Sequence, residues 1–186
     1  MGKRFEYRDL IEIINESDTS YLSYKVLLFT NEWKKFRDQI VRRDKGQCKK
    51  CGELPNQLAW HIGQDCGIYE RPPTWYEKEY MGEQIIYCSR HVVLNVHHKY
   101  YIKDKFPWEY SLDALTTLCS ECHEQVHQND DIYIYQDEHL NKFTILKNCT
   151  KCKGTGYLKE YYYNEHGICF DCLGYGSKDK AFTYNI

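Results

Sequence analysis

The N-terminal part of the chain has no long hydrophobic run. Its longest apolar stretch is Val26–Phe29, and charged residues interrupt the remainder every few positions. A secretory leader needs an apolar segment of about 7–15 residues. The sequence therefore predicts neither secretion nor a membrane partner, and it favours the reducing cytoplasm, where cysteines remain thiols.

A strong net charge is also missing. The formal net charge of −2 argues against a protein that coats nucleic acid by bulk electrostatics. Residues 119–140 contain acidic side chains but no Lys or Arg, whereas one earlier segment is basic. We expect any phosphate contact to come from that segment, and the alternative is a solvated helix face. Its basic residues are Lys34, Lys35, Arg37, Arg42, Arg43, Lys45, Lys49 and Lys50.

The chain is too short for two large hydrophobic cores. With 186 residues, of which 42% are hydrophobic, it can bury one modest core and a small satellite. Metal sites are therefore expected to decide the fold as much as core size does.

Eight of the ten cysteines fall into four Cys-x-x-Cys pairs. Two such pairs make one tetrahedral thiolate site, so the spacing predicts two structural zinc ions. The first set is Cys48, Cys51, Cys119 and Cys122, and the second is Cys149, Cys152, Cys169 and Cys172.

A helix is expected to lead into the first pair. Trp33, Phe36, Ile40 and Val41 recur at helical spacing, and Thr30 or Asn31 can cap the first free amides. The helix should end near Lys45-Gly46 and deliver a Cys-x-x-Cys-Gly knuckle directly.

Residues 53–92 are interpreted as an insertion. Within it, Thr74–Glu77 forms a capping box that predicts a short helix, and residues 85–87 and 92–94 are predicted strands. A third, mixed zinc site is one hypothesis, against two thiols and two ordinary histidines. Its ligands would be His61, Cys66, Cys88 and His91.

Histidines gather in two places that flank the second Cys-x-x-Cys pair. His97 and His98 end an alternating, β-branched run, in which successive side chains point to opposite faces. One imidazole could then bind a metal ion while its neighbour faces the attacking water. His123 and His127 lie four residues apart, on one face of a predicted helix.

The ordered set resembles the HNH (ββα-metal) endonuclease family over about residues 30–128. It comprises an aromatic-headed basic helix, Cys-x-x-Cys-Gly, a β-branched residue before His-His, and Leu-Cys-x-x-Cys-His-x-x-x-His. The resemblance implies an α+β fold and a metal-dependent endonuclease acting on DNA. By its motif, His97 and His123 are ligands of the catalytic divalent ion, His98 is the general base, and His127 is an additional ligand.

The chain departs from that family at one position. The family often has an asparagine five residues before the knuckle cysteine, whereas Ala114 stands here, so a backbone carbonyl or Asp113 would have to orient His98. Magnesium or manganese is the expected occupant, and all-nitrogen ligation also admits nickel, cobalt or zinc. The alternative is a zinc-stapled nucleic-acid-binding module with weak or no turnover.

The C-terminal part repeats Cys-x-x-Cys-x-Gly-x-Gly at Cys149–Gly156 and Cys169–Gly176. This resembles one zinc unit of the cysteine-rich repeat of DnaJ-type chaperones, and such a zinc ribbon could bind a protein partner. The predicted organisation is an N-terminal extension (1–29), the nuclease domain (30–128), a connector (129–148), the zinc ribbon (149–176) and a tail (177–186).

Overall fold

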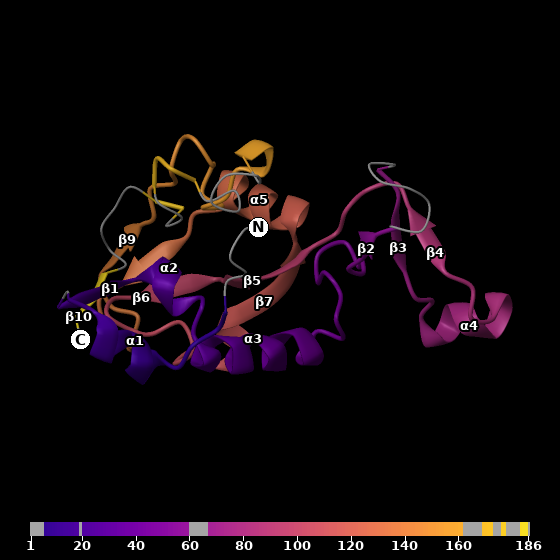
Figure 1. Ribbon diagram of the computed structural model, residues 1–186. Coiled ribbons are helices and arrows are strands. Elements are labelled where there is room, and N and C mark those ends of the chain that lie inside the picture. The colour runs from indigo at the N-terminus through magenta and orange to yellow at the C-terminus, as the bar shows by residue number, and fades with distance from the viewer. Residues whose placement is uncertain are drawn as a thin grey trace.

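The computed structural model describes residues 6–18, 20–59, 67–161, 169–172, 176–177 and 183–185. It is a mixed α+β structure, and Figure 1 shows its elements. In the described residues they are α1 (Leu10–Glu16), β1 (Tyr21–Ser23), α2 (Tyr24–Leu27), α3 (Asn31–Arg43), β2 (Gln57–Leu58), β3 (Tyr69–Arg71), α4 (Trp75–Met81), β4 (Ile86–Cys88), β5 (Leu94–His98), β6 (Tyr100–Ile102), η2 (Leu112–Ala114), β7 (Leu115–Cys119), α5 (Ser120–Asn129), β8 (Tyr133–Tyr135), β9 (Phe143–Ile145), η3 (Lys159–Tyr161) and β10 (Thr183–Asn185). Each described helix is too short or too polar to span a bilayer.

The centre of the molecule is an antiparallel pair of strands between two helices. β5 pairs with β7 in a register that sets His97 opposite Thr116 and His98 opposite Leu115. α3 packs against one side of this pair and α5 against the other (Figure 1). Because side chains alternate along a strand, neighbouring residues of β5 face different helices.

α3 begins and ends as the sequence predicts. The Thr30 hydroxyl accepts a hydrogen bond from the Trp33 amide at 3.1 Å, which caps the first turn. Trp33 and Ile40 are buried against the strands. After Arg43 the chain turns through Lys45 and Gly46, both with positive φ, and enters the first knuckle.

The two ends of the described chain share one core with the middle. β1 pairs with β10, and β8 joins a three-stranded sheet between β6 and β9. One hydrophobic cluster draws residues from the N-terminal, middle and C-terminal segments: Leu22, Tyr24, Leu27, Ile132, Ile134, Leu146 and Tyr184. The segments expected as extension, connector and tail therefore pack together.

Residues 67–88 belong to a lobe that stands apart from the centre (Figure 1). β2, β3 and β4 form its sheet, and α4 begins with the predicted capping box, in which Thr74 and Glu77 bond reciprocally. The predicted strand at 85–87 lies at Ile86–Cys88, whereas residues 92–93 precede β5, which begins at Leu94.

The proposed third zinc site falls partly outside the described residues, which leave out His61 and Cys66. Its other two members, Cys88 and His91, both lie beside Tyr69. Cys88 pairs with Tyr69 across β3 and β4, and the His91 ring stacks on the Tyr69 ring at 4.9 Å.

Candidate metal centres

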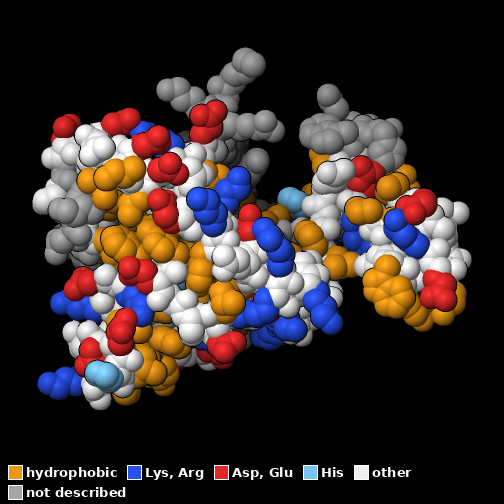
Figure 2. Space-filling model, turned by 90° about the horizontal axis from the view of Figure 1, so that it is seen from below, with side chains coloured by type: hydrophobic (Ala, Val, Ile, Leu, Met, Phe, Trp, Pro, Cys, Tyr) orange, Lys and Arg blue, Asp and Glu red, His pale blue; other side chains and the backbone are white. Residues whose placement is uncertain are grey.

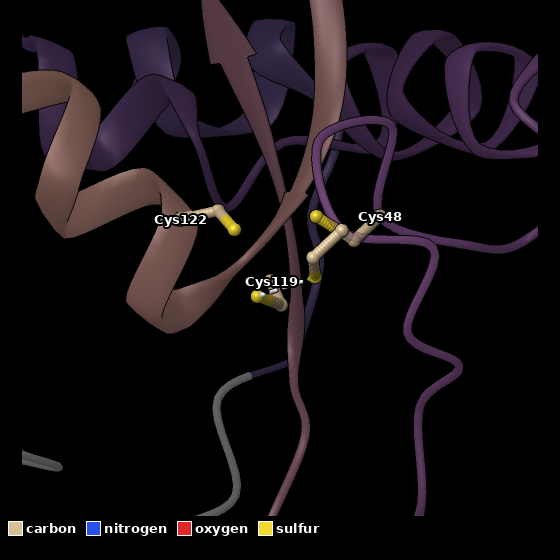
Figure 3. Close-up of side chains that lie close together, drawn as sticks. Cys48, Cys119 and Cys122 are labelled. Atoms are coloured by element: carbon tan, nitrogen blue, oxygen red, sulfur yellow. Dashed lines mark hydrogen bonds between the residues drawn. The ribbon is translucent and has the colours of Figure 1, made fainter.

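The first four cysteines converge on one point, which we call the knuckle site (Cys48, Cys51, Cys119 and Cys122). Their sulfurs all lie within 4.8 Å of one another, and Cys51 Sγ is 3.7 Å from Cys119 Sγ. Zn–S bonds of 2.3 Å in a tetrahedron place sulfurs about 3.8 Å apart. Figure 3 shows Cys122 pointing from α5 towards Cys48 and Cys119. The knuckle site could therefore hold zinc.

Backbone and side-chain contacts fix the knuckle site to the central strands. The Lys49 amide donates to the Thr117 carbonyl at 2.8 Å, and the Thr117 amide donates to the buried Asp44 carboxylate at 2.8 Å. Burial raises the pKa of the Cys48 thiol, but nearby backbone amides lower it more, to about 6. A thiol so inclined to ionise is suited to ligate a cation.

The remaining two pairs form a second cluster, the ribbon site (Cys149, Cys152, Cys169 and Cys172). The sulfurs of Cys152 and Cys172 are 3.6 Å apart, again close to the spacing around one tetrahedral ion. The repeated glycines have a definite role, because the amides of Gly156 and Gly176 each donate to the sulfur four residues earlier at 3.2 Å. A Cβ on Gly176 would lie 2.2 Å from the Gly154 carbonyl oxygen, so only glycine fits there.

Three histidines meet on the α5 side of the strands. We call His97, His123 and His127 the histidine trio, and one ring nitrogen from each lies within 4.8 Å of the others. His127 Nε2 is 3.2 Å from His123 Nε2, which fits the roughly 2.9–3.4 Å between nitrogens that share an ion at 2.0–2.1 Å. His97 and His127 are buried, and His123 is partly exposed. The trio could hold a metal ion.

Burial keeps all three imidazoles neutral at neutral pH. It lowers the pKa of His97 to about 2, helped by the charges that His123 and His127 would carry, and it lowers the pKa of His123 to about 3. The pKa of His127 falls to about 4 for the same reason, although Asn148 opposes the shift. A neutral imidazole offers a lone pair, so protons do not compete with a metal ion here.

His98 lies on the other side of the strands, and this corrects the expectation that it faces the water beside the metal site. Its Nδ1 is 3.2 Å from the Tyr24 hydroxyl, its Nε2 is 2.9 Å from the Pro107 carbonyl, and its ring stacks on Trp33 at 5.5 Å. The side chain is 2% exposed. Burial lowers its pKa to about 4, so His98 is a neutral core residue.

A backbone carbonyl or Asp113 was expected to orient His98. A backbone carbonyl does hold His98, and it belongs to Pro107. Asp113 is exposed in η2, where its own carbonyl accepts from Lys99 Nζ at 2.8 Å. Ala114 is buried against the α3 side of the core.

The basic segment divides into structural and exposed cations. Arg43 donates to the carbonyls of Leu112 and Leu115 and pairs with Asp44, and Arg37 reaches the Leu94 carbonyl at 3.4 Å. The remaining cations are exposed, and Figure 2, which views the α3 side, shows Lys and Arg gathered over that helix. They are Lys34, Lys35, Arg42, Lys45, Lys49 and Lys50.

Three residues around these centres carried no signal in the sequence. Tyr24 and Pro107 bond the two nitrogens of His98, and Asn148 donates from Nδ2 to the backbone carbonyl of His127. Tyr24 and Asn148 lie 74 and 21 residues from their histidines, and Pro107 lies nine residues after His98 in an irregular segment, so no spacing rule points to them.

Comparison with protein-family models, with curated proteins and with solved structures finds no match to the chain. The functional conclusion therefore depends on the geometry of the three centres.

Proposed function

We propose that this protein is a divalent-metal-dependent endonuclease that hydrolyses phosphodiester bonds of DNA, with the ion held by the histidine trio. The observation that supports this most directly is the convergence of three neutral imidazoles from β5 and α5 within 4.8 Å. The frame is two antiparallel strands followed by a helix, the arrangement that the resemblance to HNH endonucleases implies.

In this proposal the residues of the chain hold the three imidazoles of the trio in place and keep them neutral. The knuckle site ties the first turn of α5, through Cys122, to the end of β7 and to the segment after α3, which keeps His123 and His127 facing His97. When bound, a divalent ion would act as a Lewis acid on the phosphate, would stabilise charge on the leaving oxygen and would lower the pKa of a bound water, whose proton would pass to solvent. His98 takes no proton from water in this proposal, because both of its ring nitrogens are engaged in the core.

The exposed cations of α3 contribute only to substrate affinity in this proposal. α3 and α5 lie on opposite sides of the β5–β7 pair (Figure 1). Charges on exposed side chains are screened over about 10 Å at ordinary ionic strength. They therefore attract DNA and leave the reacting phosphate to the trio.

A second candidate is a zinc-stapled nucleic-acid-binding module without significant turnover. The burial of His98 favours it, since the histidine that the family motif assigns as general base is withdrawn from solvent. The two candidates share the cysteine sites and differ in whether the trio turns over DNA.

Plasmid nicking separates them. Zinc-loaded protein is incubated with supercoiled DNA and magnesium, manganese or nickel, beside His123→Ala and the exposed control His139→Ala. The endonuclease proposal expects nicking by the wild type and the control but not by His123→Ala. Equal nicking by all three would overturn it, and DNA binding without nicking would favour the second candidate.

A further inference from the structure

The zinc ribbon packs directly on α5, next to the histidine trio. Lys153 Nζ lies 3.8 Å from the Glu124 carboxylate, and Asn148 Nδ2 donates to the backbone carbonyl of His127. The chain is anchored on both sides of Asn148. Before it, the Leu146 amide donates to the Ile132 carbonyl in the core, and after it, Cys149 belongs to the ribbon site. The ribbon therefore forms one wall of the region around His127.

Two complementary polar atoms are buried at this contact. Among the described residues, neither His127 Nδ1 nor Asn148 Oδ1 has a hydrogen-bond partner. An imidazole N–H is a donor and an amide oxygen is an acceptor. Because an unpaired polar group is costly to bury, two such atoms at one contact are expected to satisfy each other.

The position of Gly154 shows that the two side chains are close. A Cβ on Gly154 would lie 2.6 Å from Asn148 Oδ1 and 2.9 Å from His127 Cβ, so both side chains border the same point. Gly154 also has φ of +92°, and any side chain there would press on both Asn148 and His127.

The orientation of each group is fixed by its other contact. His127 Nε2 faces His123 Nε2 at 3.2 Å, which leaves Nδ1 as the nitrogen directed away from the trio. The bond to the His127 carbonyl requires the NH₂ group of Asn148, so its oxygen is the atom that remains.

We propose that Asn148 is a positioning residue for the metal site, with its Oδ1 accepting the Nδ1–H of His127 so that the Nε2 lone pair faces the trio. This rests on the proposed function for the metal, although the hydrogen bond itself does not require the ion. A ligating histidine usually donates its second N–H to such an acceptor, and loss of that partner costs about 10–100-fold in metal affinity. The ribbon is then part of the site and not a separate module.

The test uses two substitutions of similar size. Asn148→Leu removes donor and acceptor, and Asn148→Asp keeps the acceptor but cannot donate to the His127 carbonyl. Ni²⁺ affinity is measured by calorimetry on full-length, zinc-loaded protein, and the tautomer of His127 is read from ¹⁵N-labelled histidine without Ni²⁺. Asn141→Leu, at an exposed turn, is the control. Zinc content confirms that each variant keeps its ribbon.

A positioning role predicts three results. Asn148→Leu loses about 10–100-fold in Ni²⁺ affinity, Asn148→Asp retains most of it, and only Asn148→Leu loses the Nδ1–H form of His127. If Asp and Leu are equally impaired, the bond to the backbone carbonyl explains the effect and the proposal is overturned. If the wild type binds no Ni²⁺ but shows the Nδ1–H form, the proposed function fails while the Asn148 contact stands.

Discussion

His97 and His98 are neighbours in β5, and their imidazoles lie on opposite sides of the β5–β7 pair. The His97 ring is 5.2 Å from His123 and 5.0 Å from His127, whereas the His98 ring is 5.5 Å from Trp33 of α3. The alternation of the strand separates them, and the helices on either side give them different surroundings. One histidine therefore joins the histidine trio, and the other stabilises the core.

Replacing His98 should reduce stability. His98→Ala leaves a cavity beside Trp33 and removes partners from the Tyr24 hydroxyl and the Pro107 carbonyl. We expect a loss of about 2–4 kcal/mol in the free energy of unfolding. Urea denaturation measures the free energy of unfolding. The control is Lys99→Ala, which changes the exposed residue next to His98. An unchanged midpoint in His98→Ala would contradict the core role.

Acidification should unfold the protein partly through the same residue. The folded pKa of His98 is about 4, below the ordinary value of about 6.5 in the unfolded chain. Between these values the unfolded state binds the proton and the folded state does not, so stability falls as pH falls from 6.5 towards 4. The loss due to His98 approaches about 1.4 kcal/mol per pH unit.

The pH effect is isolated by comparison with His98→Phe. Both proteins keep the trio and the cysteine sites, so the difference in their unfolding free energies between pH 7 and pH 5.5 reports His98. The wild type should lose more stability than the variant over this range. Parallel pH profiles would show that His98 is not a neutral, buried group.

Each cysteine cluster should bind one zinc ion. Cys119→Ser should lower the zinc content of the purified protein from two ions to one. It should also destabilise α5, because Cys122 in the first turn of that helix is a member of the same cluster. Cys88→Ser, outside both clusters, should keep both ions. Elemental analysis with circular dichroism measures the outcome, and full zinc content in Cys119→Ser would exclude the knuckle site.

The exposed cations of α3 should act on DNA affinity alone. Lys35→Ala and Arg42→Ala should each weaken binding similarly for all sequences and reduce the salt slope by about one. Turnover at saturating DNA should not change, because α3 is across the strands from the trio. Lys142→Ala, at an exposed turn, serves as the control in filter binding. A fall in turnover with unchanged affinity would contradict this division.

Local patterns predicted much of the structure. The Cys-x-x-Cys spacing identified both clusters, Thr30 marked the start of α3, and Thr74 with Glu77 marked the start of α4. These features depend on residues that are near in sequence. The resemblance to HNH endonucleases also grouped His97, His123 and His127, and the structure brings their ring nitrogens within 4.8 Å of one another.

The surroundings of His98 and the contact of Asn148 could not be predicted in the same way. Strand alternation implies that His97 and His98 diverge, but it does not say that Tyr24, 74 residues away, closes over one of them. Asn148 lies 21 residues from His127 and reaches it only because the ribbon folds back on α5. Such contacts depend on tertiary packing, which no local motif encodes.

The most direct test of a metal site at the histidine trio is a calorimetric titration with Ni²⁺ of protein that carries two zinc ions per chain by elemental analysis, beside His123→Ala. We expect one Ni²⁺ ion per chain to bind the wild type. His123→Ala removes a ligand, so its Ni²⁺ affinity should fall by at least the about 10–100-fold that follows the loss of a partner bonded to a ligand. Equal binding by the two proteins, or no binding by the wild type, would contradict the claim that the histidine trio is a metal site.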